Sequence, residues 1–246
     1  MNPVKRAKQE RLAVWGKHSK LEKRADPAKR VKPEKQFGPA EKRSLASRFP
    51  PANPVRNGTR KNPEKPAAQT KLEGRVWVLT DSTGRLIEDI DTDQIYHNAF
   101  LHITDIAEMG QYALGNLEGW KDFAKKAGPG DIVIAGRNFG AGSSRQQAVD
   151  CFLSLGVALI IAPSFGAIYF RNAVNSALPV LKCPALGDLT AQKKIRTGDR
   201  ISLGFKTGEA RNLTQEVSFS VDPMSEVQLQ IHEAGGLFPY ARQTGA

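Results

Sequence analysis

The residues best suited to chemistry form one glycine-rich stretch, Gly-Arg-Asn-Phe-Gly-Ala-Gly-Ser-Ser-Arg at 136–145. An apolar run precedes the stretch and a helical pattern follows it, so we expect a strand, a glycine turn and then a helix. Such a turn collects backbone N–H groups that have no partner within the helix. Ser143 and Ser144 add two hydroxyls, and Arg145 adds a guanidinium. This combination predicts a binding site for an anion.

The residues that are missing narrow the class of anion. A phosphate loop requires a lysine that is absent here, and a dinucleotide fingerprint requires a third glycine where Arg145 stands. A carboxylate, which arginine binds through two parallel hydrogen bonds, fits better. A hydrolase nucleophile at Ser143 is not supported, because Gly-x-Ser-x-Gly is not formed and His97, His102 and His232 show no Ser-His-Asp order.

A structural interpretation of the same residues stays open. Serine is preferred immediately before a helix, so Ser143 and Ser144 would also serve simply as the start of a helix over 143–155. The helix dipole disfavours a cation in the first turn. Arg145 at that place therefore favours the interpretation with a bound anion.

The surrounding pattern predicts the elements that carry this stretch. Short apolar runs at 132–135, 158–162 and 179–181 are typical of buried strands, and the segments 143–155 and 164–177 between them have helical spacing. A β-α-β-α-β order gives parallel strands with right-handed crossovers. The sequence therefore predicts an α/β fold with a βαβαβ core.

Further elements flank this core on both sides. A strand is expected at 75–79, an acidic loop at 89–93 and a helix at 104–114. Polar and apolar residues alternate at 199–204 and 216–221, which predicts antiparallel strands with one exposed face.

Charge divides the chain into two parts. Residues 1–75 hold 21 Lys and Arg against 7 Asp and Glu, a net charge of +14, whereas residues 76–246 hold 15 against 18, a net charge of −3. Residues 1–72 also hold 9 of the 15 prolines. Such a composition buries too little apolar surface to offset the entropy of ordering. We therefore expect a disordered basic extension over 1–72 and a folded domain over 73–246.

The basic extension has two interpretations. It is a solvated tail, or it is an electrostatic arm that contacts a nucleic acid or an acidic surface, since neutralised phosphates release counterions. A mitochondrial presequence is disfavoured, because Glu10, Glu22 and Asp26 interrupt the basic run.

The cysteine count and the hydropathy exclude other classes. Cys151 and Cys183 are too few for a Cys₄ zinc site or a self-contained iron–sulfur cluster, so we expect no metal site in this chain alone. No apolar run of about 18 residues and no secretory signal occurs. We therefore expect a cytoplasmic protein without membrane contact.

Four segments of the domain match one family pattern in order and spacing. They are Asp-Ile-Asp-Thr-Asp-Gln-Ile at 89–95, Asn-Phe-Gly-Ala-Gly-Ser-Ser-Arg at 138–145, Ser-Phe-Gly-Ala-Ile-Tyr-Phe-Arg-Asn-Ala-Val-Asn at 164–175 and Glu-Ala-Gly-Gly-Leu at 233–237. In these segments the chain resembles the small subunits of 3-isopropylmalate dehydratase, which are equivalent to the swivel domain of aconitase.

The resemblance implies a three-layer β/β/α swivelling domain that serves a hydro-lyase. The favoured member is 3-isopropylmalate dehydratase of leucine biosynthesis, which isomerises 2-isopropylmalate and 3-isopropylmalate by dehydration and rehydration. The substrate is then a small anionic hydroxy acid. The resemblance also implies a large catalytic subunit, which carries a four-iron four-sulfur cluster and without which this chain is inactive.

The resemblance also assigns roles to residues by their position in the motifs. Ser143 matches the family's base, and Ser144 and Arg145 match groups that hold a substrate carboxylate. Asp93 matches an active-site aspartate that orients its neighbours. A loop or capping carboxylate is the alternative for Asp93, because short-range bonding of aspartate to the backbone is common.

The chain departs from the family pattern after Arg145, and its specificity loop is ambiguous. Gln146 and Gln147 replace the usual Glu-His pair, which questions any role of that pair in orienting the arginine. The loop at 99–104 resembles the segment that selects substrate, and it offers His102 and Ile103. Ile103 favours isopropylmalate. A protonated His102 would meet an extra carboxylate, which keeps homoaconitate, aconitate and methylaconitate as alternatives.

Overall fold

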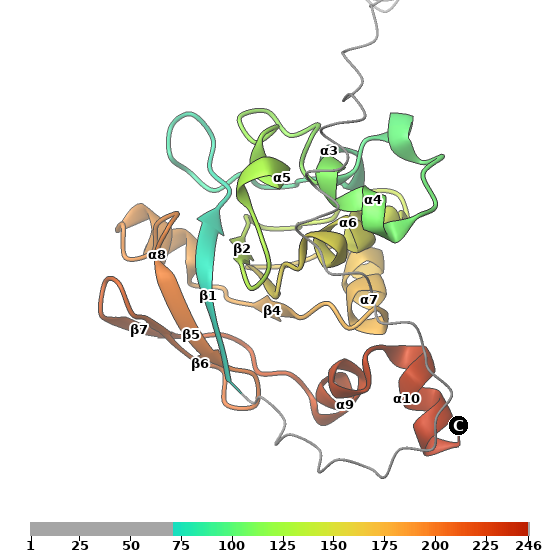
Figure 1. Cartoon of the computed structure of the whole chain (residues 1–246). Coiled ribbons are helices and arrows are strands. Elements are labelled where there is room, and N and C mark those ends of the chain that lie inside the picture. The colour runs from blue at the N-terminus through green and yellow to red at the C-terminus, as the bar shows by residue number, and fades with distance from the viewer. Residues whose placement is uncertain (1–70, 246) are drawn as a thin grey trace, which may run out of the picture. The chain divides into compact units, whose positions relative to one another are not determined.

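Seven strands form one mixed sheet in the computed structural model, which describes residues 71–245 (Figure 1). The order across the sheet is β4-β3-β2-β1-β5-β6-β7. The strands are β1 (Lys71–Val78), β2 (Ile132–Ile134), β3 (Leu159–Ala162), β4 (Val180–Lys182), β5 (Arg200–Gly204), β6 (Glu209–Asn212) and β7 (Val217–Ser220). The expectations for the basic extension lie outside the described residues, apart from its last two.

Strand β1 joins a parallel half of the sheet to an antiparallel half. Its residues 76–78 pair with β2 in parallel, and its residues 71–75 pair with β5 in antiparallel register. The strand begins at Lys71, four residues before the expected start. Lys71 and Leu72, which the composition assigned to the extension, therefore belong to this strand.

The hydrophobic core lies between the two halves of the curled sheet. Because side chains alternate along a strand, every second residue of each half faces this core. The core strand residues include Val76, Val78, Ile132, Ile134, Leu159, Ile161, Ile201 and Leu203. Val133 and Ile160 fall between these positions and are also fully buried, so they face the opposite side, where helices cover the parallel strands (Figure 1). This confirms the three-layer β/β/α arrangement.

The helices confirm the βαβαβ core, because α6 links β2 to β3 and α7 links β3 to β4. Their bounds are α3 (Thr92–Ile95), η1 (Asn98–Phe100), α4 (Ile106–Met109), η2 (Gly110–Tyr112), α5 (Phe123–Lys126), α6 (Gln147–Leu155), α7 (Ala167–Asn175), α8 (Leu186–Ala191), α9 (Glu226–Ala234) and α10 (Leu237–Thr244). Within residues 71–245, none of these helices has the length and apolarity needed to cross a membrane.

The helix expected at 104–114 is broken into the short elements α4 and η2. At the junction of the two elements, the backbone N–H of Gly110 also donates to Ser154 Oγ of helix α6 at 3.2 Å. Beyond η2 the helix cannot continue, because Leu114 has φ 57° and its backbone N–H donates to Ile95 O of α3 at 2.8 Å. The sequence pattern of 104–114 contained no sign of this long-range contact.

Asp131 is a buried carboxylate at the start of β2 that joins this strand to β1. It accepts hydrogen bonds from Arg75 Nη2 at 2.7 Å, from Trp77 Nε1 at 2.7 Å and from Gly128 N at 2.9 Å. Only 7% of its side chain is exposed.

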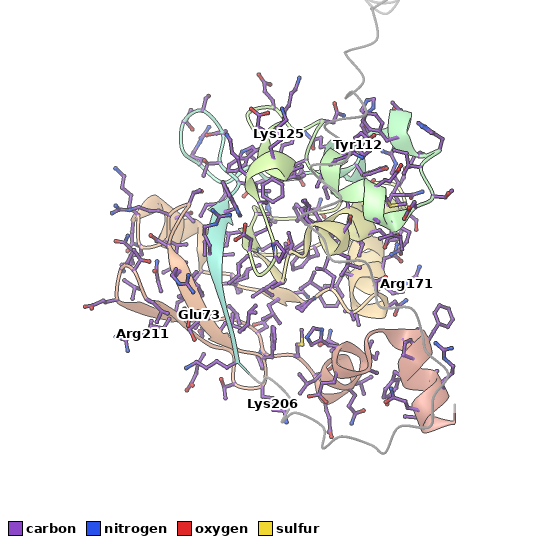
Figure 2. All side chains as sticks on the ribbon, viewed as in Figure 1. Glu73, Tyr112, Lys125, Arg171, Lys206 and Arg211 are labelled. Atoms are coloured by element: carbon purple, nitrogen blue, oxygen red, sulfur yellow. The ribbon has the colours of Figure 1, made fainter. Side chains whose placement is uncertain are left out.

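Replacing Asp131 by alanine is expected to lower the free energy of unfolding by about 2–3 kcal/mol, because the half-buried N–H groups of Trp77 and Gly128 and the Arg75 guanidinium lose a charged, buried acceptor. Urea denaturation measures the change. The control is Glu73→Ala, which removes an exposed partner of Arg200 and should cost less than about 1 kcal/mol. Glu73 is labelled in Figure 2. Equal losses for the two variants would contradict the role of Asp131.

Candidate active site

Three of the four motif segments meet through backbone hydrogen bonds in the loops that follow β1, β2 and β3. Gly140 N donates to Ile90 O at 2.8 Å, and Thr92 N donates to Ala141 O at 2.9 Å. On the other side, Gly166 N donates to Phe139 O at 2.9 Å. The loop at 137–145 is therefore held between the other two. Loops at the carboxyl ends of parallel strands are a common place for binding sites.

Two glycines of the central loop are required by its geometry. Gly140 has φ 76°, and a Cβ there would lie 2.2 Å from Tyr169 Cγ, which belongs to the buried face of α7. Gly142 has φ 90°, a conformation that L side chains rarely adopt. These positions let the loop turn tightly and approach α7 closely.

Arg145 is paired with Asp93, from the first turn of α3. Arg145 Nη1 donates to Asp93 Oδ1, and it also donates to Tyr96 O at 3.2 Å. The side chains of Arg145 and Asp93 are 18% and 32% exposed. The guanidinium holds the pKa of Asp93 below its usual range. The carboxylate is therefore ionised at neutral pH, and an ion pair stands at the centre of the site.

The predicted start of the helix after the glycine loop was wrong. Helix α6 begins at Gln147, and neither Ser143 nor Ser144 caps it; Gln146 occupies the N-cap position without a side-chain cap. Arg145 therefore precedes the helix, and its charge is balanced by Asp93. The position of Arg145 is therefore no evidence of a bound anion.

The loop itself gives the prediction of an anion site a different physical basis. Ser143 and Ser144 are exposed, and within residues 71–245 the backbone N–H groups of 142–144 have no hydrogen-bond acceptor. In the same part of the chain, Arg145 uses only Nη1 of its side-chain donors. A carboxylate fits such a set of free N–H groups. Thr92 Oγ1 donates to Ser143 O at 3.0 Å, which ties the serine turn to the helix of Asp93.

Asp93 accepts further hydrogen bonds from two residues that the sequence did not indicate. Asn98 N donates to Asp93 Oδ1 at 3.0 Å, and Asn116 Nδ2 donates to Asp93 Oδ2 at 3.0 Å. Asn116 lies 23 positions from Asp93 in the chain and belongs to none of the four motifs. No local pattern marked it, because its role comes from a turn that folds back onto α3.

An aromatic cluster supports the loop that resembles the specificity segment. The rings of Phe100 and Tyr112 stack with centroids 4.1 Å apart, and the ring of Tyr96 lies 6.4 Å from Phe100. Tyr112 is labelled in Figure 2. Tyr96 also provides the carbonyl that accepts from Arg145. The cluster therefore connects the loop to the arginine.

His102 and Ile103 lie on this loop. His102 is exposed, and its Nδ1 forms a 3.0 Å hydrogen bond with Ala99 O; Ile103 is half-buried, and its N–H donates to Phe100 O at 3.0 Å. These bonds stay within the loop. The structure thus joins Asp93 and Arg145 directly and places Ser143 and Ser144 on the adjoining turn. Within residues 71–245, His102 and Ile103 are connected to these four residues only through the loop that carries them.

Gln146 has a clear local role at the position where the family pattern has glutamate. Its Nε2 donates to Asp150 Oδ1 at 2.8 Å and to Ser176 Oγ at 2.9 Å, which joins α6 to the end of α7. Burial raises the pKa of Asp150, and the amide partly offsets this effect. A glutamate at 146 would set a second carboxylate against Asp150.

Replacing Gln146 by glutamate is therefore expected to raise the pKa of Asp150 further in the folded state. When the pKa of a group is higher in the folded state than in the unfolded state, the folded protein binds the proton more tightly. The free energy of unfolding therefore falls as the pH rises from the unfolded-state pKa to the folded-state pKa. We expect a loss of about 1–2 kcal/mol at pH 7 that disappears near pH 4. Urea denaturation at both pH values measures it. Gln192→Glu, on an exposed turn, is the control; equal pH dependence in both variants would refute the explanation.

The described residues do not fit an iron–sulfur cluster or another metal centre. Within residues 71–245, no three His, Cys, Asp or Glu side chains gather into a group that could hold a metal ion. Cys151 is completely buried in α6, and burial raises the pKa of both Cys151 and Cys183. Clusters are held by thiolates, which this environment disfavours.

Comparison with known proteins identifies the family. Residues 80–185 match the model of the aconitase C-terminal domain. The chain is 35% identical to the isopropylmalate/citramalate isomerase small subunit of Methanocaldococcus jannaschii over 172 residues, which are 70% of this chain and 94% of that protein. It is 38% identical to the 3-isopropylmalate dehydratase small subunit of Pyrobaculum aerophilum, covering 71% of this chain and 99% of that protein.

A solved structure agrees with these relatives. The 3-isopropylmalate dehydratase structure from Methanocaldococcus jannaschii superposes with a TM-score of 0.61 at 28% identity, covering 71% of this chain and 95% of that chain. The relatives are thus matched over nearly their whole length, by the part of this chain that contains the site. The resemblance of the four motifs is confirmed, and the chain belongs to the family of 3-isopropylmalate dehydratase small subunits.

Proposed function

We propose that this chain is the small subunit of a 3-isopropylmalate dehydratase, a hydro-lyase of leucine biosynthesis. The reaction interconverts 2-isopropylmalate and 3-isopropylmalate by dehydration and rehydration. The observation that carries the proposal is the Asp93–Arg145 pair beside an exposed serine turn whose N–H groups have no acceptor within residues 71–245. This arrangement suits a substrate with carboxylates, as isopropylmalate has.

Each group of the site has a role in this proposal. Arg145 binds one substrate carboxylate through the donors that Asp93 and Tyr96 leave free, and the N–H groups around Ser144 share that anion. Ser143 Oγ, as its alkoxide, would take the proton from the carbon next to the one that bears the hydroxyl, while that hydroxyl leaves toward the large subunit's cluster, whose Lewis acidity would accept it. On rehydration the hydroxyl would add to the carbon that lost the proton, and Ser143 would return the proton to the carbon that lost the hydroxyl. A serine can do so only where its alkoxide is stabilised, which the adjacent N–H groups and the guanidinium support. Asp93 keeps the guanidinium oriented.

The proposal includes a large subunit as the partner. We assign the four-iron four-sulfur cluster to that subunit, because the cysteines of this chain do not suit it. The small subunit would then cover the substrate on the cluster subunit, and the assembled enzyme would work in the cytoplasm. The nucleic-acid interpretation of the basic extension stays a separate prediction, testable by the salt dependence of RNA binding.

The substrate assignment rests on the loop with His102 and Ile103. A half-buried isoleucine supports an apolar substituent such as an isopropyl group. The Methanocaldococcus jannaschii relative is named for both isopropylmalate and citramalate, so citramalate joins homoaconitate, aconitate and methylaconitate as a competing substrate.

The decisive experiment combines this chain with its large subunit under anaerobic, reducing conditions. Conversion of 2-isopropylmalate to 3-isopropylmalate is measured beside conversion of the four competing acids. We expect isopropylmalate to have the highest kcat/KM. Preference for another acid would move the proposal to that substrate, and no conversion of any acid would refute it.

A further inference from the structure

Asn116 lies outside every motif, yet its side chain contacts the acidic partner of Arg145. Its Nδ2 donates to Asp93 Oδ2 at 3.0 Å and to Asp93 O at 3.3 Å. The other carboxylate oxygen, Oδ1, accepts from Arg145 Nη1 and from Asn98 N. Within residues 71–245, Asn116 is the only hydrogen-bond partner of Oδ2. Asn116 therefore opposes rotation of the carboxylate about its Cβ–Cγ bond.

The backbone that carries Asn116 is anchored on the helix of Asp93. Leu114 N donates to Ile95 O of α3 at 2.8 Å, and Leu117 N donates to Leu114 O at 3.0 Å. Leu114 and Leu117 are 0% and 2% exposed, whereas Asn116 itself is exposed. An exposed amide thus projects from a turn that two buried leucines hold in place.

We propose that Asn116 is a positioning residue, which acts through Asp93 to orient the Arg145 guanidinium toward a substrate carboxylate. The inference rests on the proposed function of this site. An exposed hydrogen bond adds little to the stability of a fold. A small misplacement of a binding group, in contrast, strongly reduces the rate of an enzyme. Loss of Asn116 should therefore change kinetics without changing stability.

The first test compares Asn116→Ala with wild type in the assembled enzyme. We expect KM for 2-isopropylmalate to rise about tenfold. The value of kcat should fall less, because Arg145 contacts the carboxylate both before and during the reaction. The thermal midpoint should stay unchanged. Gln192→Ala removes another exposed amide, at the end of α8, and should leave KM unchanged.

A double-mutant cycle separates action through Asp93 from an independent role. Residues that act through one another have non-additive effects. In an Asp93→Ala background, Asn116→Ala should therefore cause no further loss of kcat/KM. Losses that add in full, an unchanged KM in the single variant or a clear fall in its thermal midpoint would each overturn the proposal.

A measurement on the full chain alone keeps the inference testable without activity. The amide N–H of Asn98 donates to Asp93 and reports on its carboxylate by NMR. Asn116→Ala should shift this amide signal, and Gln192→Ala should not. An unshifted signal would overturn the inference. A wild-type enzyme that converts none of the acids would refute the proposed function instead, and the NMR comparison would still decide whether Asn116 positions Asp93.

Discussion

Replacing Arg145 by lysine is expected to lower kcat/KM by about 10²- to 10³-fold while the protein keeps its fold. Lysine preserves the positive charge beside Asp93, but an ammonium lacks the planar fork that donates to a carboxylate and to a carbonyl at the same time. In this site the guanidinium already serves Asp93 and Tyr96 through Nη1. Its remaining donors are the ones that a substrate carboxylate would use.

The measurement is steady-state kinetics of the assembled enzyme, with the thermal midpoint as a test of folding. Arg137→Lys is a matched control, because Arg137 lies on the same loop and pairs with Glu88 at 2.7 Å. Both partners of that pair are at least half exposed, so this exchange should leave kcat/KM within about twofold. Near-normal kcat/KM of the Arg145→Lys variant would contradict the proposed role of Arg145 in binding the substrate.

Replacing Ser143 by alanine is expected to lower kcat about 10³-fold with little change in KM. The proposed base is lost, whereas the backbone N–H groups and Arg145, which hold the substrate, remain. The fold should be unaffected, because the side chain is exposed and within residues 71–245 it forms no hydrogen bond. Turnover and substrate affinity are measured separately in the assembled enzyme.

Ser144→Ala is the control that distinguishes the two hydroxyls. Ser144 is proposed to hold a carboxylate, so its loss should raise KM and leave most of kcat. If kcat falls in the Ser144→Ala variant but not in the Ser143→Ala variant, Ser144 and not Ser143 is the base. Normal turnover of both variants would show that neither hydroxyl moves the proton.

The parts of the fold that were predicted from sequence are those with a strong local signal. Strands β2 and β3 are buried on both faces, so each is a continuous apolar run. Strand β6 and helices α8, α9 and α10 were not predicted. The exposed and buried residues of β6 alternate over only four positions, and α10 contains no buried residue. Neither pattern is long or apolar enough to indicate an element by itself.

The sequence by itself determined which residue types gather in the motifs, and this was enough to identify the family and the stretch that forms the site. The glycines at 140 and 142 are local requirements of a tight turn, and two serines follow them directly, so the stretch can be recognised from its residue types and spacing alone. The position of the helix start was not determined in this way. Serines before a helix predict a cap, but the loop continues to Gln146.

Only the tertiary structure decided how these residues act on one another. Arg145 and Asp93 are 52 positions apart, and the turn of Asn116 returns to α3 from another part of the chain. Such contacts arise where loops from different strands meet, and no local periodicity encodes them. The tertiary structure therefore gives Arg145 a different physical explanation. Arg145 is not a cation at a helix start that needs an anion; it is held by Asp93, and its other side-chain donors have no partner among residues 71–245.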